Sequence, residues 1–203
     1  MASTAVSEHQ LSRPGVARVT YHHGDLKREL VATAARLIEE PGASPEVSLR
    51  RVAREIGVSH VATYRHFASK ADLLSAVVDR WITTLCERML RAAASETAPR
   101  QRIDKMLEAW VQFALDVPVR FRMMAERHRD PTRPMGLSVL VDEILRGQRD
   151  GSLRAGDPSR IGRTLLLATY GYVEVALDGR LTRASAPLEE LLGPALDGIV
   201  ARR

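Results

Sequence analysis

The sequence predicts an all-α protein with an N-terminal three-helix domain and a larger C-terminal helical bundle, about nine helices in all. Apolar residues recur at three- and four-residue spacing along most of the chain, as they do on one face of an amphipathic helix. Ser, Asp, Pro and Gly stand where these runs begin and end, which is typical of helix caps. With 45% hydrophobic residues among 203, the chain can supply a substantial core.

The first three predicted helices lie close together in the sequence. The first begins near Leu26 and stops at residues 39–42, where Pro and Gly end the apolar pattern. Ser48 can cap the second helix, which ends at Gly57, a residue suited to a left-handed turn. Ser59 can cap the third helix only two residues later. Two short helices joined by such a turn predict a helix-turn-helix.

The six later helices are longer. The fourth begins at a capping box, residues 69–72, and extends to about Ala94. The fifth follows Pro99, the sixth starts at Pro118, and the seventh follows a loop at 128–134. The eighth and ninth helices are the most apolar. The eighth starts at Asp157-Pro158 and is apolar on nearly all sides, and the ninth has a stripe of Leu188, Leu191, Leu192, Ala195, Leu196, Ile199 and Val200. We expect these two helices, residues 157–203, to pair with their two-fold mates in a homodimer.

The composition limits the classes of protein that the chain can be. The net charge of +5 permits an anionic partner. The single cysteine, Cys86, excludes an intramolecular disulfide and a zinc site built from several thiolates. We expect residues 1–20 to form a flexible basic arm, and they lack the apolar core of a signal peptide. The apolar run at 165–177 is too short to span a membrane. We therefore expect a cytoplasmic protein with no membrane partner, metal or cofactor.

The third helix and the start of the second carry the residues expected to contact DNA bases. An α-helix fits the major groove, and Arg50 has the reach and the fork geometry to bind a guanine edge. The outward positions of the third helix are His60, Val61, Ala62 and Arg65. A lone basic helix is more often a solvated face of a small bundle. Here the two caps, the glycine turn and the cluster of basic and aromatic residues favour DNA binding instead.

Other side chains around this helix are expected to bind the DNA backbone. Tyr64 and His66 can donate to phosphate oxygens, and Lys70 supplies a point charge at the start of the fourth helix. Val58 and Phe67 are expected to pack inward and support the helix.

These residues match a known pattern. The segment VSLRRVAREIGVSHVATYRHFASKADLL resembles the DNA-binding segment of TetR-family transcriptional regulators, with the Tyr-x-His-Phe and the following Lys at the family's spacing. The resemblance covers about residues 20–80. YHHGDL before the first helix and ALDGRL near the end of the eighth resemble a subgroup that often carries a C-terminal Trp-His-Gly motif. This chain has Thr169-Tyr170-Gly171 there, so that motif is not retained.

The resemblance also implies roles for individual residues. By position it implies base or groove contacts from Arg50, His60, Val61 and Ala62, and phosphate contacts from Ser48, Ser59, Tyr64, His66 and Lys70, with Arg65 able to make either. Thr63 occupies a position that is usually a core leucine in relatives. Residues 21–70 would be the DNA-binding domain, and residues 71–203 the dimerisation and ligand-sensing domain.

Methionine and aromatic residues gather in predicted helices four to six. Such residues are usually ordinary core, but both tryptophans lie here in a chain with only 4% aromatic residues, which suggests a lined cavity. We expect a largely apolar effector to contact Trp81, Met106, Trp110, Phe113 and Met123. Arg120 or Arg122 could anchor an acidic group, although a solvated arginine is the more common outcome.

The sequence lacks a catalytic motif, so an enzyme is not expected. His128-Arg129-Asp130 imitates a kinase triplet, but the chain has neither an asparagine nor a glycine-rich phosphate loop. We predict a homodimeric repressor of transcription that binds a palindromic operator through residues 48–67 and is released by a small molecule. Two alternatives stay open: a helical small-molecule-binding protein or enzyme with an incidental basic segment, and an architectural DNA-binding protein without effector.

Overall fold

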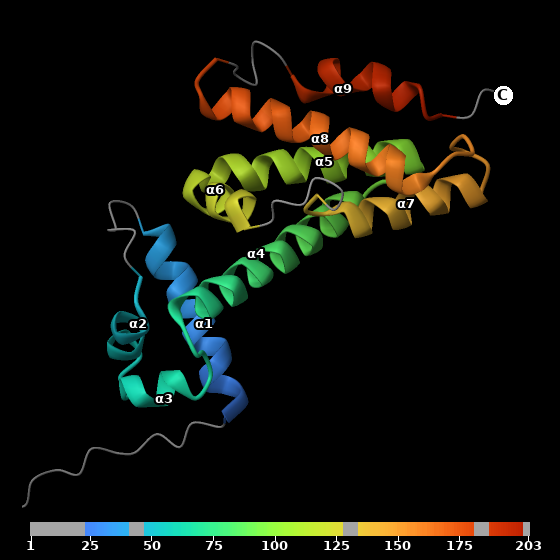
Figure 1. The fold of residues 1–203 in the computed structure, drawn as a ribbon. Helices are drawn as coiled ribbons and strands as arrows, with labels where there is room; N and C mark the ends of the chain where they lie inside the picture. The colour runs from blue at the N-terminus through green and yellow to red at the C-terminus, as the bar shows by residue number, and fades with distance from the viewer. Residues whose placement is uncertain (1–22, 41–46, 128–133, 181–186, 201–203) are drawn as a thin grey trace, which may run out of the picture.

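The computed structural model describes residues 23–40, 47–127, 134–180 and 187–200 (Figure 1). Within these residues the chain forms nine α-helices, which are α1 (His23–Glu39), α2 (Leu49–Glu55), α3 (His60–Tyr64), α4 (Lys70–Ala93), α5 (Pro99–Asp116), α6 (Pro118–Arg127), α7 (Leu137–Arg149), α8 (Pro158–Leu177) and α9 (Leu188–Asp197). The predicted all-α fold class is confirmed. The predicted basic arm, residues 1–20, lies outside the described residues.

Helices α1, α2 and α3 form a small unit, at the lower left of Figure 1. Leu30, Val52 and Phe67 are almost completely buried in its core. Gly57 joins α2 to α3 with a φ of 74°, a left-handed conformation that glycine adopts without a steric penalty. The predicted helix, glycine turn and helix are therefore all present.

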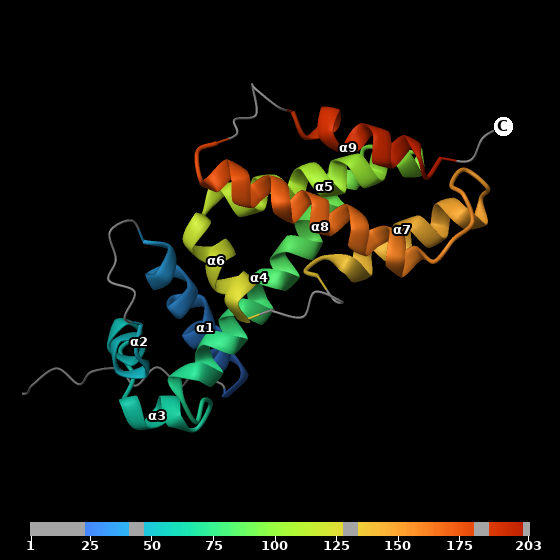
Figure 2. The ribbon, with the colours of Figure 1, turned by 45° about the horizontal axis from the view of Figure 1, so that its top comes forward.

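The long helix α4 connects this unit to the rest of the protein. It packs against α1 near its start and against α5 further along, and Figures 1 and 2 show it running between the two parts. The Ser69 hydroxyl accepts a hydrogen bond from the Asp72 amide at 3.1 Å, so the predicted cap is confirmed. The buried face of α4 consists of Leu73, Leu74, Val77, Val78, Trp81, Leu85, Met89 and Ala93.

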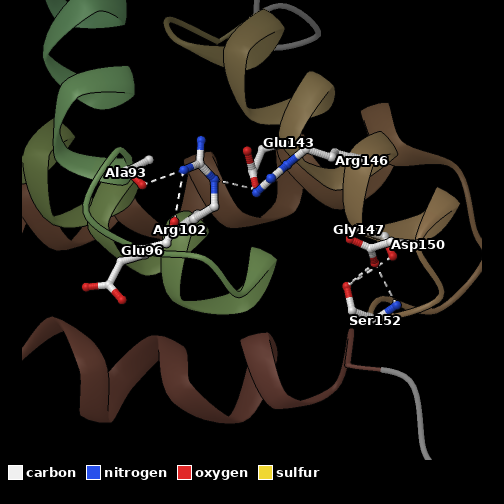
Figure 3. A network of polar contacts seen from close by, with 8 residues as sticks. All are labelled: Ala93, Glu96, Arg102, Glu143, Arg146, Gly147, Asp150 and Ser152. Atoms are coloured by element: carbon white, nitrogen blue, oxygen red, sulfur yellow. Dashed lines mark hydrogen bonds and ion pairs between the residues drawn. The ribbon is translucent and has the colours of Figure 1, made fainter.

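The far end of α4 is fixed to α5 and α7 by Arg102 (Figure 3). Its Nη1 donates to the carbonyls of Ala93, at 2.6 Å, and Glu96, at 3.1 Å, while its Nε donates to the Glu143 carboxylate at 3.0 Å. Glu143 is buried and also pairs with Arg146 on its own helix. The buried carboxylate thus has two cationic partners, and Arg102 binds a carbonyl at the end of α4, where helical amides are lacking.

Helices α8 and α9 lie beside each other and cover α5, at the top of Figure 1. Leu192 and Leu196 pack into the core of the same chain, whereas Leu191 is 51% exposed. The predicted stripe on α9 is therefore divided between two faces. The helix also ends at Asp197, before the predicted Val200, because the chain there pairs with the segment after α7, where the Arg154 amide donates to the Ile199 carbonyl at 2.8 Å.

Candidate nucleic-acid interface

Both helices of the helix-turn-helix are capped by serine. Ser48 Oγ accepts from the Arg51 amide at 3.1 Å, and Ser59 Oγ accepts from the Ala62 amide at 3.2 Å. Each hydroxyl still has its own proton to donate, and both serines are exposed. The caps therefore fix the starts of α2 and α3 and leave two hydroxyl donors at the surface, as a phosphate contact would require.

The inner side of α3 is closed by buried residues. Phe67 is buried and Val58 packs partly buried against the core, as the sequence predicts. Thr63 is completely buried at the position that is usually leucine in relatives. Its hydroxyl donates to the His60 carbonyl at 2.6 Å within the same turn of helix. The core thus accepts a polar side chain here because the hydroxyl is satisfied locally.

The outer side of α3 presents the residues predicted to contact bases. Val61 is 57% exposed and Tyr64 is 56% exposed, and His60 and Arg65 are exposed beside them. The His60 and Tyr64 rings meet edge to face with their centroids 6.4 Å apart. Ala62 is half-buried and packs against the core, so it can offer only part of its surface.

The remaining predicted contacts, from Arg50 to a base and from Lys70 and His66 to phosphates, lie around this outer side. Arg50 is exposed on the first turn of α2, and Lys70 is exposed at the first residue of α4. His66 is half-buried and already interacts within the protein, so it is the least accessible of the predicted phosphate ligands. The ten predicted DNA-binding residues lie on α2 and α3, at their N-terminal caps, in the turn after α3 and at the first residue of α4.

The residues predicted to bind an effector lie in the C-terminal bundle and its junction with α1. Trp81, Met106, Trp110 and Phe113 are buried, and Met123 packs half-buried against the same core. Trp110 donates its indole N–H to the Met135 carbonyl at 3.0 Å and meets the Phe121 ring edge to face. These contacts show how Trp110 stabilises the bundle. An effector contact from the five residues stays a prediction.

Trp81 also lines a cavity of about 440 Å³ between α1, α4 and α6, together with Glu39, Arg80 and Arg120. Arg120 was predicted as a possible anchor, whereas neither Glu39 nor Arg80 was predicted to lie here. They come from two other helices, and no spacing in the sequence indicates that these helices meet at this point.

The described residues do not favour a metal site, a membrane-spanning helix or a reactive thiol. Among them, no group of three or more His, Cys, Asp or Glu side chains could hold a metal ion. None of the described helices is long and apolar enough to cross a membrane. Cys86 is half-buried, and burial raises the pKa of its thiol, which disfavours the reactive thiolate.

Comparison with known proteins agrees with this geometry. Residues 30–77, which include all of α2 and α3, match the family model of bacterial regulatory proteins of the tetR family. A solved TetR/AcrR-family transcriptional regulator from Thermobifida fusca is 27% identical, with a TM-score of 0.58, over 88% of this chain and 100% of that chain. Residues 30–77, with the helix-turn-helix, therefore belong to the tetR family of bacterial regulatory proteins.

Two further relatives match most of this chain. A solved protein of unknown function from Rhodococcus sp. RHA1 is 30% identical, with a TM-score of 0.68, and the match covers 89% of this chain and 96% of that one. The nucleoid occlusion factor SlmA of Vibrio vulnificus is 26% identical over 163 residues, or 75% of this chain and 82% of the relative.

Proposed function

We propose that this protein is a ligand-responsive repressor of transcription, which binds a palindromic operator as a homodimer and leaves it when a small molecule binds the C-terminal domain. The observation that carries the DNA-binding part is the outer side of α3. A valine and a tyrosine stand more than half exposed there, between the exposed cations Arg50, Arg65 and Lys70. Apolar side chains can contact thymine methyl groups, and cations can bind phosphates and guanine edges.

The homodimer is supported by the outer face of α8 and α9. Leu167 is 49% exposed on α8, with the small residues Ala168 and Gly171 exposed beside it. Leu191 is 51% exposed on α9. Small side chains let two helices approach closely, and exposed leucines at their centre favour a protein partner. A two-fold contact here would bury these groups in a four-helix arrangement.

Binding of duplex DNA at increasing salt tests the DNA-binding part. If a dimer neutralises six to ten phosphates, its affinity should fall by about 10³ to 10⁵ between about 50 and 200 mM salt. Tyr64→Glu should abolish most of the binding, since it places a negative charge against the phosphates. Leu90→Glu, which changes an exposed side chain on α4 by the same charge, should bind like the unchanged protein. Equal binding by both variants would contradict the proposal.

The relatives called nucleoid occlusion factor support a second candidate, an architectural DNA-binding protein that needs no effector. The two candidates share the α3 surface and differ in the ligand response. A thermal-shift screen with small molecules separates them, because a ligand that binds only the folded protein raises its melting temperature. A repressor should respond to one chemical class of compounds, and an architectural protein to none.

A further inference from the structure

The cavity between α1, α4 and α6 lies where the DNA-binding unit meets the C-terminal bundle. Figure 2 shows these three helices converging there, and each packs against the other two. The cavity is lined by Ala32, Ala35, Arg36, Glu39, Glu40, Arg80, Trp81, Thr84 and Arg120. Its volume of about 440 Å³ falls within the range of small-molecule sites. A ligand here would touch both parts of the protein at once.

The side chains that line the cavity carry more positive than negative charge. Arg36 is already held by two carboxylates, those of Glu40 and Glu55, the latter at 2.6 Å. Arg80 forms no ion pair within the part of the chain that the structure describes, and it is exposed. Arg120 pairs with Glu39 and is also near the Asp116 carboxylate, which does not line the cavity. Among the lining side chains, three arginines (Arg36, Arg80 and Arg120) stand against two glutamates (Glu39 and Glu40), so one positive charge is in excess there.

Arg120 carries the strongest signal, because it is largely buried and its one ion pair among the described residues is long. Its side chain is 12% exposed, and its Nη1 lies 3.5 Å from the Glu39 carboxylate, longer than a normal charge-assisted hydrogen bond. Its Nη2 donates to the Phe113 carbonyl at 3.0 Å, and the guanidinium stacks 3.8 Å from the centroid of the Phe113 ring. Its Nε is buried without a hydrogen-bond partner among the described residues.

Arg102, near the other end of α4, is an arginine of the same protein whose guanidinium donates to three protein groups. Its contacts to one carboxylate and two carbonyls lie between 2.6 and 3.1 Å. Buried polar groups are rarely left without partners unless they serve a ligand, a reaction or an unseen water. Arg102 therefore holds helices together, whereas Arg120 is available to an additional anion.

We propose that this cavity binds a small organic monocarboxylate, whose carboxylate pairs with Arg120 and Arg80 and whose apolar body lies against Trp81, Ala32 and Ala35. A single negative charge matches the single excess positive charge, and the two glutamates would repel a more highly charged phosphate. The guanidinium fork is suited to a planar carboxylate.

The bound carboxylate competes with Glu39 for Arg120. Glu39 is the last residue of α1, and its contact with Arg120 links α1 to α6. A ligand that takes over Arg120 would weaken this link and change the position of the DNA-binding unit relative to the bundle. Binding of the carboxylate does not depend on the proposed function. Only the effect of that binding on operator affinity rests on the proposed function.

Nuclear magnetic resonance can test the binding step without DNA. The chain has two tryptophans, so its spectrum contains two indole N–H signals, one from Trp81 and one from Trp110. Benzoate and hexanoate should shift the Trp81 signal saturably and leave the Trp110 signal in place, because Trp110 donates its indole N–H to Met135 elsewhere in the bundle. Benzamide, which has the shape of benzoate without its charge, should shift neither signal.

Four variants of the full chain identify the anchoring groups. Arg120→Gln should weaken benzoate binding by about 10- to 100-fold, as expected for a lost hydrogen bond to a charged group. Arg80→Gln, at an exposed position that should not affect folding, should weaken it by about 2- to 5-fold. Glu39→Gln should strengthen it by a similar factor, because the competing carboxylate is gone. Arg122→Gln, an exposed neighbour on α6 outside the cavity, should change nothing.

The proposal is wrong if benzamide binds as tightly as benzoate, or if benzoate moves both indole signals or neither. It is also wrong if Arg120→Gln and Arg80→Gln bind benzoate as tightly as the control Arg122→Gln does. A protein that fails to bind an operator would still give the Trp81 shift. Failure of the proposed function and failure of this site are therefore measured separately.

Discussion

The outer side of α3 and the outer face of α8 and α9 both expose large apolar side chains, yet their surroundings differ. Val61 and Tyr64 on α3 stand among histidine, arginine and lysine. Leu167 stands beside Ala168 and Gly171, and Leu191 lies one turn before Ala195. All four of these apolar side chains are about half exposed. The cations around the first face suit a polyanion, and the small residues around the second suit another helix packed closely against it. The neighbours of an exposed apolar group therefore indicate its partner better than the group itself does.

The largest expected effect comes from placing charge on the α8–α9 face. The double variant Leu167→Glu/Leu191→Glu should be a folded monomer in sedimentation, because both side chains are exposed in a single chain and would meet like charges in a dimer. Its operator affinity should fall by about 10² to 10⁴, since two linked half-site contacts become one. Leu145→Glu, on the exposed side of α7, should remain dimeric. If the double variant remained dimeric, the α8–α9 face would not be the dimer contact, and its difference from the α3 side would not indicate a partner.

Leu192 is the wrong place for this test, although it belongs to the stripe predicted from the sequence. Its side chain is only 6% exposed within a single chain. A buried carboxylate there would lack a cationic partner and should unfold the protein rather than separate two folded copies. Thermal melting distinguishes these outcomes.

A smaller effect is expected from Arg50→Ala on the α3 side. The variant should lose about 1–3 kcal/mol for each guanine contact and should accept other bases at one position of each half-site. Competition between duplexes that differ at single positions measures both effects. Unchanged base preference together with weaker overall binding would assign Arg50 to the phosphates instead.

Lys70→Ala should act on all sequences alike. Because the lysine is a point charge for the DNA backbone, its loss should reduce the slope of log affinity against log salt by about one for each half-site. Titration of matched and mismatched duplexes at several salt concentrations checks this. A change in base preference would show that Lys70 lies closer to the groove than the structure of the free protein indicates.

The smallest effect is expected under α3. Thr63→Val keeps the shape of the buried side chain and removes the hydroxyl that donates to the His60 carbonyl. That carbonyl also belongs to an exposed residue, so water can replace the lost donor, and stability should change by less than about 1.5 kcal/mol. Denaturant unfolding measures the change. A larger loss would mean that the outer side of α3 depends on this bond for its conformation.

Local signals in the sequence were sufficient for most of the fold. Ser48, Ser59 and Ser69 cap the helices that their positions predict, since a cap depends only on residues within one turn. The buried position of Thr63 was indicated by the resemblance, in which relatives usually have a core leucine there.

Contacts between distant segments could not be predicted in this way. The stripe on α9 looks continuous in sequence, but the packing of Leu192 against the same chain and the pairing near Val200 divide it. The link between Glu39 and Arg120 joins residues 81 positions apart, and only the packing of α1 against α6 brings them together. Periodicity shows which residues share a face, but it does not show which element covers that face.

Selection of binding sites from random duplexes tests most directly the claim that two copies of the α3 surface bind DNA together. The account predicts enrichment of a palindromic site whose half-sites are centred about 34–36 Å apart, one helical turn, or a multiple of that distance. The same selection with Tyr64→Glu should enrich nothing. Enriched sites without two-fold symmetry, or the same sites recovered by the variant, would contradict it.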